Sequence, residues 1–238
     1  MKKLIYIFLT VLIVACSSDN GDSNQSSCNG DNPVYLADNG VTIKARDCAV
    51  FGDTGVINGI IYTVVSKQTL VSMINSGQDI SKVCTTRINI MSSLFSLKTS
   101  FNQPIGNWDV SNVTIMGFMF LGASSFNQPI GNWDVSNVTD MQFMFSSATS
   151  FNQSITNWNV SSVRNMSNMF QNGNFNFSIE NWNVSSVTTM NAMFQNTNLF
   201  NQNLSSWNVD NVISCINFSD NTPQWNFPKP NFTNCNPN

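Results

Sequence analysis

The residues that could do acid–base chemistry are few in this chain, and their spacing argues against catalysis. Histidine, the commonest general base and metal ligand, is absent from the 238 residues. Asp109 and Asp134 occupy equivalent sequence contexts, but the next equivalent positions hold Asn159, Asn183 and Asn208. A position that accepts asparagine is typical of a turn cap rather than of a catalytic acid. Without a Cys-x-x-Cys pair, a Gly-x-Ser-x-Gly motif or a phosphate-binding loop, the sequence predicts no enzyme, no cofactor and no metal site.

The first residues predict export. The pair Lys2-Lys3 precedes an apolar run from Leu4 to Val14, which is too short to span about 30 Å of hydrocarbon. This order is typical of a signal peptide, here residues 1–15, rather than of a buried N-terminal strand with a chance cysteine. The run ends in Ile-Val-Ala-Cys16, which resembles the lipobox of bacterial lipoproteins. That resemblance implies lipidation of Cys16 and therefore a membrane partner, reached through a lipid anchor.

Residues 16–33 are rich in Ser, Asn, Gly and Asp, so we expect them to form a flexible tether. The start of the chain also resembles lipoproteins of Bacteroidetes, in which acidic residues after the cysteine accompany export to the surface; Asp19 and Asp22 fit that pattern. The resemblance implies a protein of the outer membrane, anchored by lipid and displayed on the cell surface. The formal net charge of −3 is too small to favour nucleic acid as a partner.

A repeat dominates the remaining sequence. Five tryptophans recur at spacings of 25, 25, 24 and 25 residues, at Trp108, Trp133, Trp158, Trp182 and Trp207. One such unit cannot bury its own apolar residues, so units of this kind must stack on one another. We expect the repeats to span residues 88–219.

Each unit carries two patterns. In the first unit, Val113, Met116, Met119 and Phe120 follow the spacing of a short helix, whereas the segment 103–108, centred on Ile105, favours a short strand. The sequence therefore predicts the α/β repeat class, as a leucine-rich-repeat-like solenoid of short parallel strands and short helices with a cap at each end. Two asparagine columns, Asn102 to Asn201 and Asn107 to Asn181, are expected to form hydrogen-bonded ladders with turn backbone; the alternative is that these asparagines bind a ligand.

The unit Phe-Asn-Gln-x-Ile-x-x-Trp-(Asp/Asn)-Val-Ser-x-Val-x-x-Met-x-x-Met-Phe resembles the repeat of BspA-like leucine-rich-repeat surface proteins, which is also seen in mycoplasma lipoproteins. The resemblance covers roughly residues 41–236. It implies a leucine-rich-repeat-like fold and a surface location, and for some members adhesion to host proteins. The chain departs from the pattern where Phe177 replaces the glutamine and where Cys215 replaces a methionine.

The ends of the repeat read as caps. Residues 34–87 are the expected N-terminal cap, with strand-like stretches at 41–45 and 60–65 and a helix over 66–75 that Ser66 begins and Gly77 ends. Residues 220–238 are the expected C-terminal cap. In an exported protein the cysteines favour disulfides. Position along the chain suggests Cys215–Cys235 and Cys48–Cys84, which leaves Cys28 unassigned.

The expected function is presentation of a surface that binds a protein or a glycan of a host or a neighbouring cell. The positions flanking the buried isoleucine column are small and nearly uncharged, which suits contacts with backbone or sugar hydroxyls. They are Pro104, Gly106, Pro129, Gly131, Ser154, Thr156, Ser178, Glu180, Asn203 and Ser205. The alternative is a structural envelope or spacer protein without a specific ligand.

Overall fold

The computed structural model describes residues 28–238. The expected signal peptide of residues 1–15, the lipidation site Cys16 and residues 17–27 of the expected tether lie outside the described residues. Within residues 28–238, none of the helices has the length and apolar character needed to cross a bilayer.

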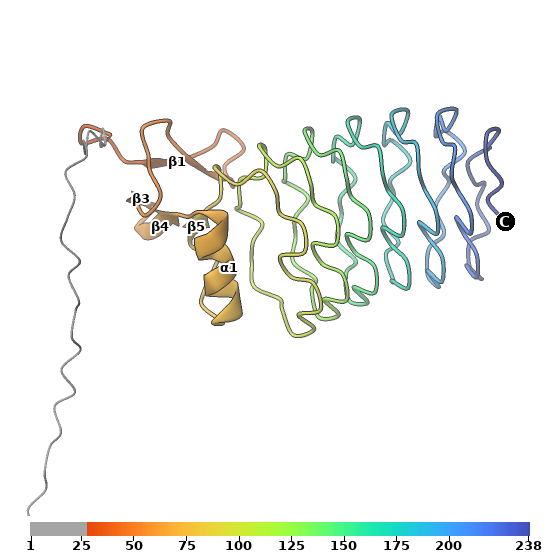
Figure 1. The fold of residues 1–238 in the computed structure, drawn as a ribbon, viewed down its shortest axis with the longest axis horizontal. Helices are drawn as coiled ribbons and strands as arrows, with labels where there is room; N and C mark the ends of the chain where they lie inside the picture. Colours follow the sequence, from red (N-terminus) through yellow and green to blue (C-terminus); the bar gives the residue numbers. More distant parts are fainter. Residues whose placement is uncertain (1–27) are drawn as a thin grey trace, which may run out of the picture.

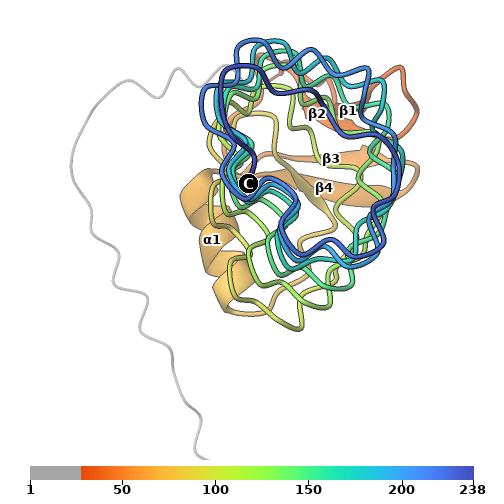
Figure 2. The ribbon, with the colours of Figure 1, turned by 90° about the vertical axis from the view of Figure 1, so that its right-hand side faces the viewer.

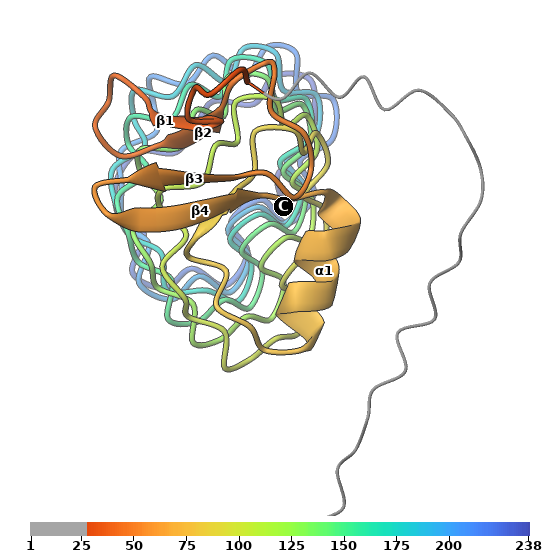
Figure 3. The same cartoon turned by 90° about the vertical axis from the view of Figure 1, so that its left-hand side faces the viewer.

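The N-terminal cap consists of two small sheets and one helix (Figure 3). In the first sheet, β1 (Val34–Leu36) pairs antiparallel with β2 (Ile43–Ala45). The second sheet has the order β3-β4-β5: β3 (Thr54–Ile57) and β4 (Ile60–Val64) form an antiparallel hairpin, and β5 (Val83–Cys84) runs parallel to β4.

Helix α1 (Lys67–Asn75) confirms the local reading of the sequence. Ser66 is its N-cap, and the Ser66 hydroxyl accepts a hydrogen bond from the Thr69 N–H at 3.0 Å. The chain turns away at Gly77, whose φ of +70° lies in the left-handed region that glycine tolerates best. Leu70 is fully buried, which fixes the helix to the end of the repeat.

Beyond the cap, the chain winds into coils that stack along the long axis of the molecule (Figure 1). Seen along that axis, successive coils lie almost on top of one another (Figure 2). We call residues 88–219 the coil stack. Consecutive coils are joined by single parallel bridges, from Ile90–Ile115 through to Thr189–Ser214.

The predicted α/β class, with short parallel strands and short helices in a leucine-rich-repeat-like solenoid, is wrong. In the described residues α1 is the only helix, and it belongs to the cap rather than to the repeat. The coil stack contains turns and isolated bridges instead of helices and strands. The physical reason is that the segment with helix-like spacing pairs with the neighbouring coils, whereas the segment with strand-like character does not.

The segment read as a helix is the one that carries the bridges. We call residues 115–122 and their equivalents the ladder segment. Within it, hydrogen bonds alternate: the Met119 N–H donates to the Met116 carbonyl at 3.1 Å within the coil, whereas the Phe118 N–H donates to the Gln142 carbonyl of the next coil at 2.8 Å. Consecutive turns reproduce the i, i+3 spacing of a helix, so the spacing alone wrongly predicted a helix. The segment 103–108, read as a strand, contains a turn.

Each ladder segment has left-handed residues four positions apart, which stop a helix from forming. In the second and third full coils they are Phe143 (φ 55°) with Ser147 (φ 58°), and Asn168 (φ 59°) with Asn172 (φ 57°). Most L-residues avoid this region at a cost of about 1–2 kcal/mol. Cross-coil hydrogen bonds and stacking offset that cost. Phe118 and Phe143 both have a left-handed backbone, and their rings stack with 4.9 Å between centroids.

The core of the coil stack is built from columns of identical side chains. The rings of Phe120, Phe145 and Phe170 stack at 5.5 and 5.9 Å, and each is fully buried. The indole N–H of Trp133 donates to the Ile105 carbonyl of the preceding coil at 3.1 Å, and Trp158 repeats this contact with Ile130. Each tryptophan thus buries its ring while its polar atom keeps a partner.

At the C-terminal end, residues 220–238 cover the core of the last coil. Trp225 is 6% exposed and meets Phe200 edge-on at 4.7 Å between ring centroids. The Cys215–Cys235 disulfide ties this segment down, as the sequence suggested.

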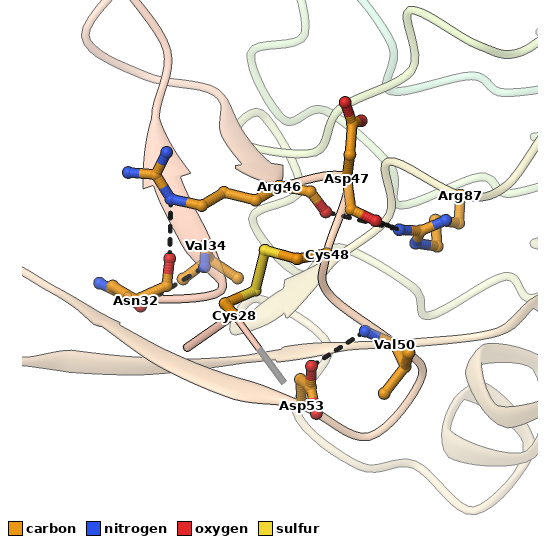
Figure 4. The surroundings of a disulfide bond; sticks show 9 residues. All are labelled: Cys28, Asn32, Val34, Arg46, Asp47, Cys48, Val50, Asp53 and Arg87. Atoms are coloured by element: carbon orange, nitrogen blue, oxygen red, sulfur yellow. Dashed lines mark hydrogen bonds between the residues drawn. A yellow bond between two sulfur atoms is a disulfide. The ribbon is translucent and has the colours of Figure 1, made fainter. Parts of the chain in front are cut away.

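The second expected disulfide, Cys48–Cys84, is wrong. Cys48 is bonded to Cys28, which the sequence placed in the tether (Figure 4). Arg46 lies beside this bond and donates from its Nε to the Asn32 carbonyl at 3.0 Å. Cys84 points instead into an apolar cluster with Ile43 and Val64 and is free. Burial raises the pKa of the Cys84 thiol.

Candidate functional site

The two columns predicted as a binding face lie at the surface on either side of a fully buried column that includes Ile105, Ile130 and Ile155. Pro104, Pro129, Ser154, Glu180, Asn203 and Ser205 are exposed, and Gly106, Gly131, Thr156 and Ser178 are half-buried. The structure therefore brings the ten residues onto one side of the coil stack.

Close approach between coils explains the glycines of this face. A Cβ added to Gly106 would lie 2.5 Å from the Pro129 carbonyl oxygen, and one on Gly131 would lie 2.6 Å from that of Ser154. In the next coil the same column holds Thr156, whose hydroxyl donates to the Ser178 carbonyl at 2.7 Å. The glycines thus serve coil-to-coil contact in addition to keeping the face small.

The first asparagine column forms the expected ladder. The Asn102 side-chain oxygen accepts the Asn127 backbone N–H at 3.0 Å, and the contact recurs in each later coil until Asn201 accepts from Asn226 at 2.8 Å. The second column does not repeat a ladder: Asn107 donates to the Ser81 carbonyl, but within residues 28–238 the exposed Asn132 and Asn157 have no hydrogen-bond partner. These amides are therefore available to solvent.

The acidic column caps turns. Asp134 accepts from both the Ser136 N–H and hydroxyl, and Asn159 does the same for Ser161. Asp109 makes the equivalent contacts but is 2% exposed, and Lys44 of β2 lies 3.8 Å from its carboxylate. This ion pair attaches the cap to the first full coil. Among residues 28–238 no cluster of side chains could hold a metal ion.

A groove of about 410 Å³ opens where the cap meets the predicted face. Its walls are mostly apolar: Ile60 and Tyr62 come from β4, whereas Pro104 and Pro129 come from the face. The other lining residues are Val41, Ser81, Lys82, Gly106, Asn107, Gln128 and Asn132. Concave, mainly apolar sites with a few polar groups are typical of ligand binding.

Of the ten predicted face residues, Pro104, Gly106 and Pro129 line the groove and the other seven do not. The sequence did not predict the wall that the cap supplies. Ile60 and Ile61 of β4 are both exposed, at 42% and 60%, which is unusual for isoleucine in a hairpin. Strand alternation puts Ile60 on the same face as Tyr62, toward the groove, and Ile61 on the other face. The available signal in the sequence was the adjacent pair Ile60-Ile61, because an exposed hairpin strand usually alternates apolar with polar residues.

A family model described as "Mycoplasma protein of unknown function, DUF285" matches residues 65–176 and again residues 154–234. Together the matches begin at α1 and run through the coil stack into the C-terminal segment. No curated protein and no solved structure matches the chain.

Proposed function

The chain belongs to the Mycoplasma protein family of unknown function DUF285, and we propose that it is a lipid-anchored surface protein that binds another protein or a glycan. The binding site is the groove between β4 and the predicted face. The observation that carries the proposal is this groove of about 410 Å³, in which the exposed Ile60 faces Pro104 and Pro129.

The charge distribution favours an uncharged ligand. Between residues 101 and 219 the only basic residue is Arg164, and it lies outside the groove. Lys82 is the one charged residue that lines the groove. Apolar walls with amide groups at the rim, from Gln128 and Asn132, suit a peptide backbone or the hydroxyls and ring faces of a sugar.

Surface display rests on sequence. The lysine pair, the apolar run and Cys16 support export and lipid anchoring, and the BspA-like repeat supports adhesion at a cell surface. The alternative of an envelope spacer remains a distinct proposal, because a spacer needs no ligand and its surface can vary freely.

The test is a screen of the protein spanning residues 17–238, made in an oxidising compartment, against arrays of matrix proteins and glycans. We expect saturable binding to one class. The Pro104→Arg variant, which adds a large charged group at an exposed residue that lines the groove, should fold normally and lose most of that binding. Absence of binding on both arrays would favour the spacer.

A further inference from the structure

The last ladder segment differs from those before it in its backbone. In the fourth full coil the N–H groups of Ala192, Phe194 and Asn196 each donate to a carbonyl of the last coil, at 2.9 Å in all three cases. The equivalent N–H groups of the last coil belong to Asn217, Ser219 and Asn221. Within residues 28–238 these three have no acceptor. We call them the donor row.

Apolar side chains border the donor row at positions where the preceding coil has polar residues. Ile213 and Ile216 are 70% and 59% exposed. The equivalent residues one coil earlier are Thr188 and Asn191, as the hydrogen bonds that link the coils show. Two isoleucines at the open end of a polar surface column are typical of a contact surface rather than of a solvated one.

Two side-chain ladders also end here with unused acceptors. The Asn172, Asn196 and Asn221 amides are linked in sequence at 2.8 Å, each Nδ2 donating to the oxygen of the preceding coil. Beside them, the Gln195 amide donates to the Asp220 carboxylate at 3.3 Å. The Asn221 amide oxygen and the Asp220 carboxylate thus face the end of the stack as hydrogen-bond acceptors.

A second copy of this chain does not fit the donor row. Two such ends brought together would oppose donors to donors. The end that could offer carbonyls carries the cap (Figure 1): α1 packs Val71 and Ile74 against the core, and its Asn75 accepts from Lys98, the residue after the first ladder segment, at 3.1 Å.

We propose that the donor row binds a backbone segment of another protein, which adds to the stack as a further ladder segment. The partner offers carbonyl oxygens at alternate residues, apolar contacts to Ile213 and Ile216, and an Asn or Gln side chain that donates to Asn221 and Asp220. The five bridges between existing coils show the geometry that such a segment adopts. This surface lies at the opposite end of the stack from the groove and is independent of it.

The test uses a peptide of residues 163–173 with blocked ends, which carries Gln171 and Asn172 in the register that extends both side-chain ladders. In this peptide Arg164→Ile and Ser167→Ile supply the apolar contacts, because these two positions align with Ile213 and Ile216 of the last coil. Hydrogen exchange of the Asn217, Ser219 and Asn221 amides is measured by NMR with peptide in excess. We expect exchange at all three to slow by about tenfold, the effect of one net hydrogen bond each. A peptide with Gln171→Glu and Asn172→Asp should fail, because it sets charge against Asp220.

The matched protein variant is Ile213→Thr with Ile216→Asn, which installs the residues of the preceding coil and should therefore fold. It should lose the protection given by the peptide. Unchanged exchange at saturating peptide would overturn the proposal, and so would equal protection by both peptides. Protection that appears without peptide and grows with protein concentration would assign the surface to a second copy and overturn it as well.

Discussion

At the scale of single residues, asparagines of the two columns differ in whether their side chains form hydrogen bonds to the next coil. Asn152 receives a hydrogen bond at its side-chain oxygen from the Asn176 N–H at 3.1 Å. Asn157, five residues later and also exposed, has no partner within residues 28–238. The first stabilises the stack by satisfying backbone, whereas the second is solvated at the face.

We therefore predict different costs for two alanine substitutions. Asn152→Ala leaves the Asn176 N–H without its acceptor and should lower the free energy of unfolding by about 1 kcal/mol. Asn157→Ala should change it by less than about 0.5 kcal/mol. Urea unfolding followed by tryptophan fluorescence measures both. Equal effects would contradict the assignment of the ladder to the first column alone.

Cys84 gives a prediction about pH. Burial raises the pKa of its thiol, so folding favours the neutral form. The corresponding stability is complete below the ordinary thiol pKa and declines as the pH rises through the higher folded pKa.

Mass spectrometry after maleimide treatment at pH 8 should find Cys84 unmodified in the folded protein and modified after unfolding in urea. Rapid labelling of the folded protein would show that the thiol is accessible.

At the scale of elements, the ladder segment shows what sequence can and cannot determine. The repeat period, the caps, α1 with its Ser66 N-cap, and the first asparagine ladder were all predictable, because each depends on local pattern. The spacing of residues could not show that the helix expected over Val113–Phe120 is wrong, because consecutive turns and a helix share the i, i+3 contacts. Only the left-handed residues distinguish them, and these include Phe118, a residue type that rarely signals such a backbone.

This backbone yields a stabilising substitution. Ser147 has a φ of 58°, and the preceding coil holds Gly122 at that position with a φ of 65°. Ser147→Gly should raise the free energy of unfolding by about 0.5–1 kcal/mol by relieving the left-handed strain. Ser150→Gly, at an exposed position without positive φ, should be neutral or destabilising. A loss of stability in the Ser147 variant would contradict the strain argument.

The disulfides show why the cap pairing escaped prediction, whereas the C-terminal pairing did not. Cys48 and Cys84 both belong to the cap, yet the chain path brings Cys28 to Cys48, with 5.1 Å between Cα atoms. At the other end, Cys215–Cys235 closes a loop with a sequence separation of 20. Removing it by Cys215→Ala with Cys235→Ser should cost about 3 kcal/mol through unfolded-chain entropy.

A matched control exists, because Cys28–Cys48 has the same sequence separation. Removing either bond should lower the denaturation midpoint, but only the C-terminal change should alter the tryptophan fluorescence, since Trp225 belongs to the segment that Cys215–Cys235 ties down. A variant without Cys215–Cys235 that has unchanged fluorescence and unchanged stability would show that the bond does not hold the segment in place.

At the scale of the whole molecule, the coil stack carries different surfaces at its two ends. The cap closes one end and builds a groove with the face, while the donor row is open at the other. The face residues were predictable, because outward positions repeat with the coils. The groove was not, since it needs Ile60 and Tyr62, which the sequence places about 40 residues from Pro104 but the fold places beside it.

The most direct measurement compares two neighbouring substitutions on β4, with the ligand class identified by the arrays as the titrant. Ile60→Lys puts a charge into the groove wall, whereas Ile61→Lys puts the same charge on the opposite face of the strand. With both variants folded, we predict that Ile60→Lys weakens binding at least about tenfold, equal to about 1.4 kcal/mol, and that Ile61→Lys binds as the unchanged protein does. Equal affinities for all three proteins would show that the groove is not the binding site.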